Sequence, residues 1–336
     1  MAGAASGNIQ FDAVGIGNAI VDVLAHAEES ALVALGLPKG AMTLIDATEA
    51  ETLYRHMGPG IECSGGSAAN TIAGLASLGA KAAFIGKVKS DQLGQVFRHD
   101  IQSLGVHFTT PPAASGPATA RCFVFVTPDA QRTLQTYLGA CVELGAEDID
   151  AAVIAASRVT YLEGYLYDPP RAKEAFLKAC DIAHASSREV ALSLSDPFCV
   201  SRHRRDFREL VADHVDILFA NEHEITALYE VENFDAALQA VRGHCEIACL
   251  TRSEKGSVVL SKDEVHVIDA APIAHVVDTT GAGDLYAAGF LYGYTRGRGL
   301  AASGRLASLC AAEVIGHIGA RPETALSELA RAAGLA

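Results

Sequence analysis

The sequence predicts one α/β domain, with a mostly parallel β-sheet at its centre and a smaller sheet beside it. Half of the 336 residues are apolar, enough to build one large core without disulfide bonds. After residue 146, apolar strand patterns alternate with helical patterns of about ten residues or more, which is the order of βαβ units. The strand patterns before that point do not follow this alternation, which indicates a second, smaller sheet.

The N-terminal half carries the strands that do not alternate with helices. We expect strands at residues 11–16, 20–27, 41–45, 82–86, 118–127 and 132–137, and helices at 28–35, 67–78 and 91–104. The last two strands are joined by Pro128-Asp129-Ala130, which favours a turn. The segments 18–46 and 107–140 are expected to form the small sheet, and a sheet at one end of an α/β core is suited to act as a lid.

The C-terminal half has the regular pattern of a parallel sheet. Helices at 147–156, 170–185 and 202–211 precede strands at 159–162, 190–194 and 217–220, and another strand is expected at 246–250. Three helices, at 282–296, 299–316 and 322–334, end the chain. No linker rich in Pro, Gly or Ser divides it, so residues 1–336 are predicted as a single domain.

Composition excludes several classes of partner. The 40 acidic residues exceed the 26 basic ones, giving a net charge of −14, which argues against nucleic acid. The eight cysteines form no C-x-x-C pair and no zinc-ligand spacing, so we expect reduced thiols. No apolar run is long enough to span a bilayer, and residues 1–7 do not resemble a signal peptide. A cytoplasmic protein without a membrane partner is therefore expected.

The strongest chemical signal is Asp278-Thr-Thr-Gly-Ala-Gly-Asp284, which precedes a helix rich in small residues. A glycine-rich turn at a helix N-terminus presents backbone N–H groups and the positive end of the helix dipole, which suits a phosphate. Gly281, Ala282 and Gly283 are the candidate donors. Asp284 and a bound phosphate would both be negative, so Asp284 is not expected to bind the phosphate itself. It is expected to act on a second substrate, by accepting the proton of the hydroxyl that attacks the phosphate. A plain helix start with an acidic first turn is the alternative interpretation.

A second motif, Gly65-Gly-Ser-Ala-Ala-Asn70, begins a helix more than 200 residues upstream. Together the two motifs resemble the signatures of the PfkB family, which includes ribokinase, fructokinase and adenosine kinase. The resemblance covers the whole chain. It implies a ribokinase-like three-layer αβα core with a mostly parallel sheet and a small β-sheet lid, and an ATP-dependent kinase that phosphorylates a primary hydroxyl of a nucleoside or sugar.

The resemblance also assigns roles to individual residues. The residues expected to bind substrate are Asn18, Asp22, Gly65, Gly66, Asn70, Tyr165 and Phe198. Those expected to border ATP and its phosphates are Arg132, Asn221, Glu224, Thr251, Gly256 and Thr280, with the segment 316–321 beside the adenine. Glu224 is expected to hold Mg²⁺ through water, and Asp278 to contact a monovalent cation, K⁺ in some relatives.

The substrate is left open between a nucleoside and a sugar. Ser195-Asp-Pro-Phe198 resembles a segment of adenosine kinases in which Phe encloses the base, and adenosine is favoured for that reason. A ribokinase- or fructokinase-type sugar kinase remains an alternative, as does a nucleoside-binding regulatory module without catalysis. A nicotinamide-dependent dehydrogenase is excluded, because Ile20 stands where G-x-G-x-x-G requires glycine. Either a monomer or a homodimer fits the sequence.

Overall fold

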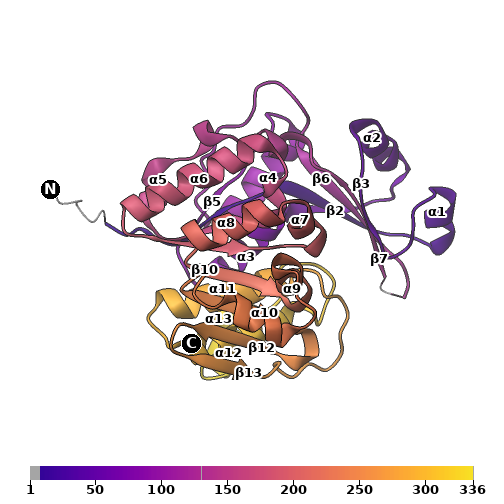
Figure 1. The fold of residues 1–336 in the computed structure, drawn as a ribbon. Helices are drawn as coiled ribbons and strands as arrows, with labels where there is room; N and C mark the ends of the chain where they lie inside the picture. Colours follow the sequence, from indigo (N-terminus) through magenta and orange to yellow (C-terminus); the bar gives the residue numbers. More distant parts are fainter. Residues whose placement is uncertain (1–7, 130, 336) are drawn as a thin grey trace.

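The protein forms a three-layer core with a small sheet projecting from one end (Figure 1). The computed structural model describes residues 8–129 and 131–335. The N-terminal segment 1–7 and Ala130 of the expected turn lie outside the described residues. The predicted fold class, a mostly parallel α/β core with a second small sheet, is confirmed.

The central sheet has eight strands. Its order is β13 (Val265–Ile268), β12 (Ser257–Ser261), β11 (Ile247–Thr251), β10 (Ile217–Asn221), β9 (Glu189–Ser193), β8 (Ser157–Glu163), β1 (Phe11–Ile16) and β5 (Ala82–Ile85). The pairs from β11 to β5 are parallel, whereas β12 and β13 add an antiparallel edge. The carboxyl ends of six parallel strands therefore share one edge, where ligands of open α/β sheets bind.

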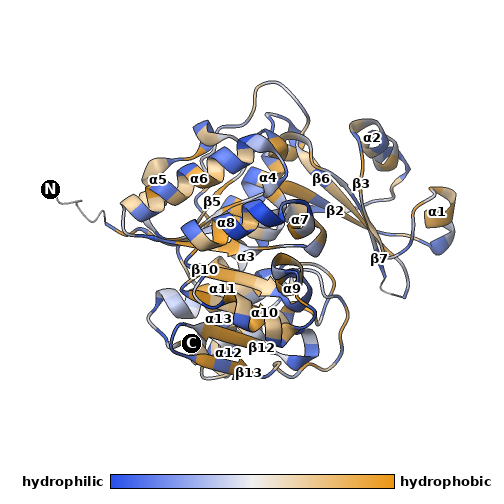
Figure 2. Ribbon diagram, viewed as in Figure 1, coloured by the Kyte–Doolittle hydropathy of each residue, from blue (hydrophilic) through white to orange (hydrophobic). Residues whose placement is uncertain are grey.

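Alternate residues of each strand enter the two layers of helices. In β10, Ile217 and Phe219 belong to one apolar cluster, and Leu218 and Ala220 to the other. One layer contains α3 (Ser67–Ser77), α4 (Gln92–Ser103), α11 (Ala282–Thr295), α12 (Leu300–Val314) and α13 (Leu326–Ala332). The other contains α5 (Ala151–Ala155), α6 (Pro170–Ala185), α8 (Arg204–His214), α9 (Glu222–Tyr229) and α10 (Phe234–Val241). Figure 2 shows the apolar residues concentrated on the strands between these layers.

The small sheet has two chemically different faces. Its order is β3 (Met42–Leu44), β7 (Arg132–Tyr137), β6 (Ala120–Val126), β2 (Ile20–His26) and β4 (Ile61–Gly65). One face carries Val21, Val23, Phe123 and Phe125, and packs with Leu32 of α1 (Glu29–Ala34) and Leu53 of α2 (Ala47–His56). The register places Asp22, Leu24, Cys122, Val124, Val126, Arg132 and Leu134 on the opposite face, which we call the inner face.

Several elements differ from the sequence prediction. α2, β4 and the antiparallel pair β12–β13 are not anticipated, and β4 extends the small sheet beyond the expected segments. The helix expected at 147–156 is a 3₁₀ turn followed by the short α5, because the Asp150 side chain starts a new helix by accepting from Ala152 and Val153. The last helix begins at Leu326 rather than at 322. Within the described residues, no helix combines the length and apolarity needed to cross a membrane.

Adjacent residues of α6 offer a test of the packing. Phe176 is fully buried and lies against the ring of Tyr167, whereas Leu177 is 42% exposed. Phe176→Ala is expected to lower the free energy of unfolding by about 3–5 kcal/mol through the cavity it leaves. The control, Leu177→Ala, is expected to change it by about 0.5 kcal/mol or less. Urea unfolding measures both, and equal losses would contradict the assignment of α6 to the core.

Candidate active site

Asp284 lies where the two sequence motifs meet. It occupies the first turn of α11, and its Oδ1 accepts a hydrogen bond from Ser67 Oγ at 2.6 Å. Its Oδ2 accepts from Asn70 Nδ2 at 3.0 Å. Both partners belong to the beginning of α3, over 200 positions earlier in the chain. The structure therefore brings Asp284 and Asn70 together, and it adds Ser67, which the sequence analysis does not single out.

The turn before α11 leaves backbone donors open. Gly281 has a left-handed φ of 79°, and a Cβ there would lie 2.8 Å from Ala320, so only glycine fits without strain. The N–H of Ala282 donates to Thr279 within the turn (3.2 Å). Among the described residues, the N–H groups of Gly281 and Gly283 have no such partner. Of the three expected donors, two are therefore open, because the N–H of Ala282 is bonded within the turn.

The side of Gly283 that would carry a side chain faces open space. The residue is exposed, and no atom lies within 4 Å of the position that a Cβ would take. An anion can therefore approach the main chain at this point, next to the positive end of the α11 dipole. We call residues 278–284 the anion turn.

Asp278 organises the start of the anion turn. Its Oδ1 accepts from the N–H and the hydroxyl of Thr280, at 3.0 and 2.8 Å. Its Oδ2 accepts from the N–H of Gly319 at 3.1 Å, and forms an ion pair with Nη1 of Arg132 at 2.8 Å. Both charged side chains are 7% exposed. Arg132 of the small sheet thus reaches the anion turn, and its contact with the phosphates of ATP stays a prediction.

Asp22 projects from the inner face of the small sheet towards the same region. No described residue donates a hydrogen bond to its carboxylate, so both oxygens remain open to hydroxyl groups of a ligand. A Cβ at Gly65 would lie 2.2 Å from the Asp22 carboxylate, and a Cβ at Gly66 would lie 2.1 Å from the carbonyl oxygen of Asn18. The two glycines are therefore required by the packing of 65–66 against 18–22. Burial raises the pKa of Asp22 to about 6, although Arg321 and Arg132 oppose the shift.

Glu163 is a functional candidate that the sequence analysis does not identify. It ends β8, and its Oε1 accepts from Nδ2 of Asn18 at 2.6 Å. Its Oε2 accepts from the N–H of Ala68 at 2.8 Å. Helix α3 lacks a side-chain cap at Gly66, so Glu163 caps it from another strand. The sequence signal that could have identified Glu163 is its position as an acidic residue at the carboxyl end of an apolar parallel strand. Burial raises the pKa of Glu163 to about 7.

The Oδ1 atom of Asn70 is buried and has no hydrogen-bond partner in the described chain. Its Nδ2 is already engaged by Asp284. An orphaned buried acceptor carries a desolvation penalty that a ligand donor would remove. A hydroxyl donor beside Asn70 would satisfy this atom.

Asn221 and Glu224 form a helix cap at the end of β10. The N–H of Glu224 donates to Asn221 Oδ1 (2.9 Å), and Glu224 accepts from the backbone and side chain of Asn221 (2.9 and 2.6 Å). This is a capping box of α9, so N-x-x-E also has a structural explanation. Burial, together with repulsion from Asp196 and Asp284, raises the pKa of Glu224 to about 7. A cation nearby would relieve that repulsion.

Thr251 and Gly256 border the same edge of the sheet. Thr251 ends β11 and pairs with Asn221 of the neighbouring strand. Gly256 has a φ of 79°, and a Cβ there would lie 2.0 Å from the carbonyl oxygen of Ile268. The glycine is therefore explained by the tight turn into β12, independently of any nucleotide.

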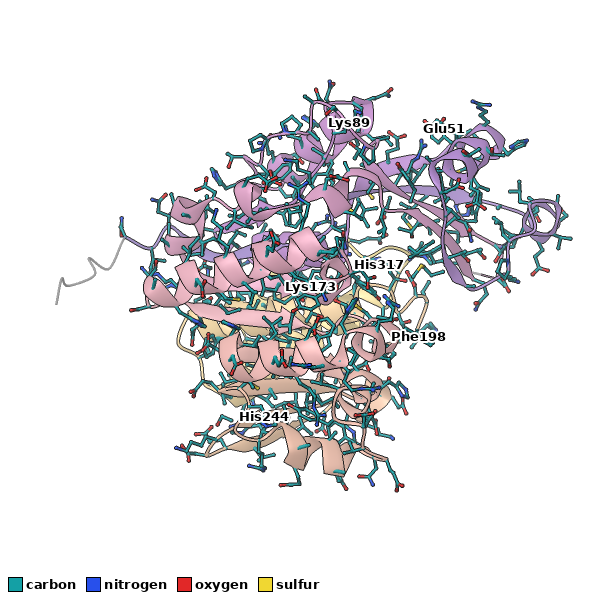
Figure 3. The ribbon with its side chains drawn as sticks, turned by 45° about the horizontal axis from the view of Figure 1, so that its top comes forward. Glu51, Lys89, Lys173, Phe198, His244 and His317 are labelled. Carbon is teal, nitrogen blue, oxygen red and sulfur yellow. The ribbon has the colours of Figure 1, made fainter. Side chains whose placement is uncertain are left out.

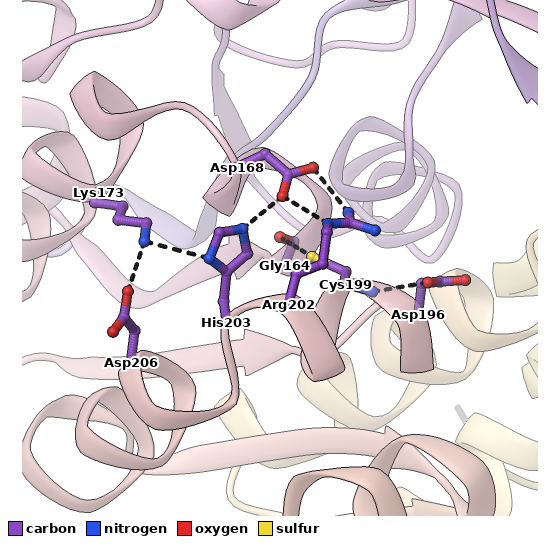
Figure 4. Close-up of polar contacts among 8 residues, drawn as sticks. All are labelled: Gly164, Asp168, Lys173, Asp196, Cys199, Arg202, His203 and Asp206. Atoms are coloured by element: carbon purple, nitrogen blue, oxygen red, sulfur yellow. Dashed lines mark hydrogen bonds and ion pairs between the residues drawn. The ribbon is translucent and has the colours of Figure 1, made fainter.

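Two aromatic side chains are exposed beside the site. Tyr165 is 40% exposed, and Phe198 is 74% exposed at the start of α7 (Pro197–Arg202). In Figure 3, Phe198 projects from the core on the side of the small sheet. Polar contacts hold both ends of α7, as Figure 4 shows. Asp196 caps the helix, Cys199 Sγ contacts the carbonyl of Gly164, and Arg202 and His203 both bind Asp168.

The sequence model of the pfkB family carbohydrate kinases matches residues 41–325. The chain belongs to this family. It is 55% identical to the adenosine kinase from Sinorhizobium meliloti, with a TM-score of 0.89 over 96% of this chain and 99% of the other. It is 52% identical to a probable sugar kinase from Rhizobium etli CFN 42, with a TM-score of 0.91 over 98% and 100% of the two chains. It is 30% identical over 266 residues to the ATP-dependent ribose-1-phosphate kinase of Halopiger xanaduensis, covering 77% of this chain and 83% of that relative.

Membership of the pfkB family confirms the main functional expectation. The protein is a phosphotransferase, a kinase for a sugar or nucleoside. Kinases of this family use ATP, typically with Mg²⁺. The anion turn, which contains Asp284, and the Gly65–Asn70 motif lie at one site of this pfkB kinase, although they come from two separate parts of the chain.

The two glycines of the anion turn should respond differently to the same substitution. Gly281→Ala is expected to lower the free energy of unfolding by about 1–3 kcal/mol, because a side chain there is strained and meets Ala320. Gly283→Ala, the matched control, is expected to leave stability unchanged or to raise it by up to about 1 kcal/mol, since alanine favours a helical position with free space. Thermal unfolding compares them. Equal destabilisation would contradict the open geometry at Gly283.

Proposed function

We propose that the protein transfers the γ-phosphoryl group of ATP to the primary hydroxyl of a nucleoside, with adenosine as the first candidate. The observation that carries this proposal is the position of Asp284. Its carboxylate is fixed by Ser67 and Asn70 of the Gly65–Asn70 motif, and it follows the open donor Gly281 by three residues. One site thus offers a base for an alcohol and a cradle for the phosphoryl group that the alcohol attacks.

Asp284 is proposed as the general base. Each of its oxygens accepts one hydrogen bond and keeps a lone pair for the substrate hydroxyl. Burial raises the pKa of Asp284 above the ordinary carboxyl value, which strengthens it as a base, while bonds from Ser67 and Asn70 oppose the shift. The N–H groups of Gly281 and Gly283 are proposed to hold the charge that develops on the transferred group. Asp22 and Asn70 Oδ1 are proposed to bind hydroxyls of the sugar ring.

Mg²⁺ would enter mainly with the phosphates of ATP. No cluster of three or more His, Cys, Asp or Glu side chains within the described residues is arranged to bind a metal ion directly. Glu224 and Asn221 are oxygen donors that can hold it through water, which is the ligand type that Mg²⁺ retains. When bound, the ion would neutralise charge on the phosphates. A monovalent cation at Asp278 would compete with Arg132 and Gly319, because all its hydrogen-bonding positions are occupied.

A nucleoside is favoured over a simple sugar by the apolar surface beside Asp22. Cys122, Val124 and Val126 of the inner face pack with Leu24, Leu134 and Ile318. Phe198 and Tyr165 offer exposed rings. Cys122, Val124 and Val126 are already buried, so the apolar area still open to a ligand belongs to Leu24, Leu134, Ile318 and the two rings. A purine base would bury part of this area, whereas a ribose bound to Asp22 would not require it. The non-catalytic alternative is disfavoured because Asp284 and the open donors are both present.

The small sheet is proposed to act as a lid over the bound nucleoside, excluding water that would compete as acceptor. Arg132 supports this role, because it connects the sheet to the anion turn through Asp278. We also place the enzyme in the cytoplasm. All eight cysteines are free thiols, as in proteins of reducing compartments.

Replacing the proposed base tests the mechanism. Asp284→Asn is expected to lower kcat by about 10²–10⁴-fold, with little change in the affinity for ATP. In the wild type, kcat/KM should fall as the pH decreases through the pKa of Asp284, because the base becomes protonated, and this limb should lie above the range of an ordinary aspartate. Release of ADP measures turnover, and calorimetry measures ATP binding. A variant with near wild-type turnover would remove Asp284 from the mechanism.

Substrate class is tested by an ADP-release assay on a panel of nucleosides and sugars, combined with Phe198→Ala. Since Phe198 is 74% exposed, its loss should not affect folding. KM for adenosine is expected to rise by about 10-fold or more, the worth of one stacked ring, with no change for ribose or fructose. Ser201→Ala, on the same helix, serves as the control. Faster turnover of a sugar than of any nucleoside would favour the sugar-kinase alternative.

A further inference from the structure

Arg321 contacts the segment 64–70, which contains the Gly65–Asn70 motif, yet no step of the proposed reaction uses this arginine. It lies in the loop between α12 and α13. Its Nε and Nη2 donate to the carbonyl oxygen of Ser64, at 3.1 and 2.7 Å, and Nη1 donates to the carbonyl oxygen of Ala69 at 2.9 Å. Ser64 precedes Gly65, and Ala69 precedes Asn70. One planar guanidinium therefore holds both ends of the segment 64–70, a geometry that a lysine ammonium cannot reproduce.

Ser64 extends this contact to the partly buried carboxylate of Asp100. Nη2 of Arg321 also donates to Ser64 Oγ at 3.0 Å. Ser64 in turn donates to Asp100 Oδ2 through its N–H at 2.8 Å and its hydroxyl at 2.5 Å. The arginine, the serine and the aspartate thus form a continuous chain from the C-terminal loop to α4. Such networks specify one arrangement of the backbone when every member is satisfied.

The residues just before Arg321 lie against the anion turn. The N–H of Gly319 donates to Asp278 Oδ2, and Ala320 occupies the space that a side chain at Gly281 would need. Three consecutive residues, 319–321, therefore connect the anion turn to the segment 64–70. The sequence predicts that this loop borders the adenine of ATP, but the side chain of Arg321 points to the segment 64–70, which is expected to bind the sugar or nucleoside.

We propose that Arg321 is a positioning residue for phosphoryl transfer: it holds the segment 64–70 against the anion turn, and it places a positive charge beside Asp22 and Asp284. The proposal rests on the proposed function, because it concerns the alignment of the attacking hydroxyl with the phosphoryl group. In-line transfer is sensitive to such alignment. Asn70 and Ser67, which bind Asp284, both belong to the segment that Arg321 fixes.

The charges around the site are consistent with the second part of this role. Attraction to Arg321 lowers the pKa of both Asp22 and Asp284, against the effect of burial. Burial in turn lowers the pKa of Arg321, while Asp22, Asp100 and Asp284 stabilise its charge. The titratable and charged groups that interact with Asp284 from the surrounding elements are Asp22 of the small sheet, Tyr161 and Glu163 of β8, Tyr165, Glu224 of α9 and Arg321.

Three substitutions separate the geometric and the electrostatic contributions. Arg321→Lys keeps the positive charge and loses the planar guanidinium. Arg321→Gln keeps a hydrogen-bond donor and loses the charge, and Arg321→Met loses both the charge and the donors. Arg305→Gln, at an exposed position of α12, is the control. Each variant is assayed for kcat and KM with adenosine and with ATP over a range of pH. Amide hydrogen exchange is measured on the ligand-free proteins for peptides that cover 64–70 and 279–284.

All three variants are expected to lower kcat/KM for adenosine by about 10–100-fold, the scale of a misplaced reactant. The KM for ATP should stay within about two-fold of wild type, since ground-state binding of ATP is not removed. The acid limb of kcat/KM should move to higher pH in Arg321→Gln and Arg321→Met, because Asp284 and Asp22 then gain protons more readily. It should stay in place in Arg321→Lys. Exchange should accelerate in both peptides in all three variants, and not in Arg305→Gln.

The proposal is overturned if Arg321→Gln and Arg321→Met keep wild-type kcat/KM, or if all three variants lose stability and activity alike with an unmoved acid limb. The second result would mean a structural contact only. If the wild-type protein phosphorylates no nucleoside or sugar, the proposed function fails. Hydrogen exchange then still decides whether Arg321 holds the two segments together, because that measurement needs no turnover.

Discussion

The close contact between helices α3 and α11 is the constraint on which the site depends. A Cβ at Gly74 of α3 would lie 2.6 Å from Leu285 Cδ1 and 2.8 Å from Ala288 Cβ of α11, so the side chains of α11 pack directly against the backbone of α3. The N-termini of both helices point to the same place, which puts Asp284 within hydrogen-bond distance of Ser67 and Asn70. Larger residues at this contact would move Asp284 away from Ser67 and Asn70.

The second organising influence is charge. Burial raises the pKa of four carboxyl groups around the site, those of Asp22, Glu163, Glu224 and Asp284. Arg132 and Arg321 provide positive charge among them, one from the small sheet and one from the C-terminal loop. A neutral substrate with several hydroxyl donors suits such acceptors, and a metal–nucleotide complex adds positive charge without displacing either arginine.

Sequence reasoning predicted those parts of the molecule that local patterns determine. The alternation of strands and helices gave the parallel core, and the glycine-rich turn led directly to Asp284. Glu163, Ser67 and Arg321 were missed because their roles come from contacts across the fold, which no local spacing reveals. The same limit explains why α2 and β4 were not predicted, since their sequences are too polar to form a clear apolar pattern. The strands β12 and β13 were also not predicted, because they pair antiparallel without the intervening helix that marks a βαβ unit. The N-x-x-E pattern was found, but its capping geometry required the structure.

The segments that join the two sheets are also the segments that would hold the substrate. The chain passes from β1 to β2 through Gly17 and Asn18, and from β4 to α3 through Gly65 and Gly66, and these crossings pack against each other and against Glu163. A ligand bound between them would fix the angle of the small sheet to the core. Binding of the ligand and closure of the small sheet would then be a single event, because the same contacts would give affinity and exclude water. The product could leave only as fast as the segments 17–18 and 65–66 move apart.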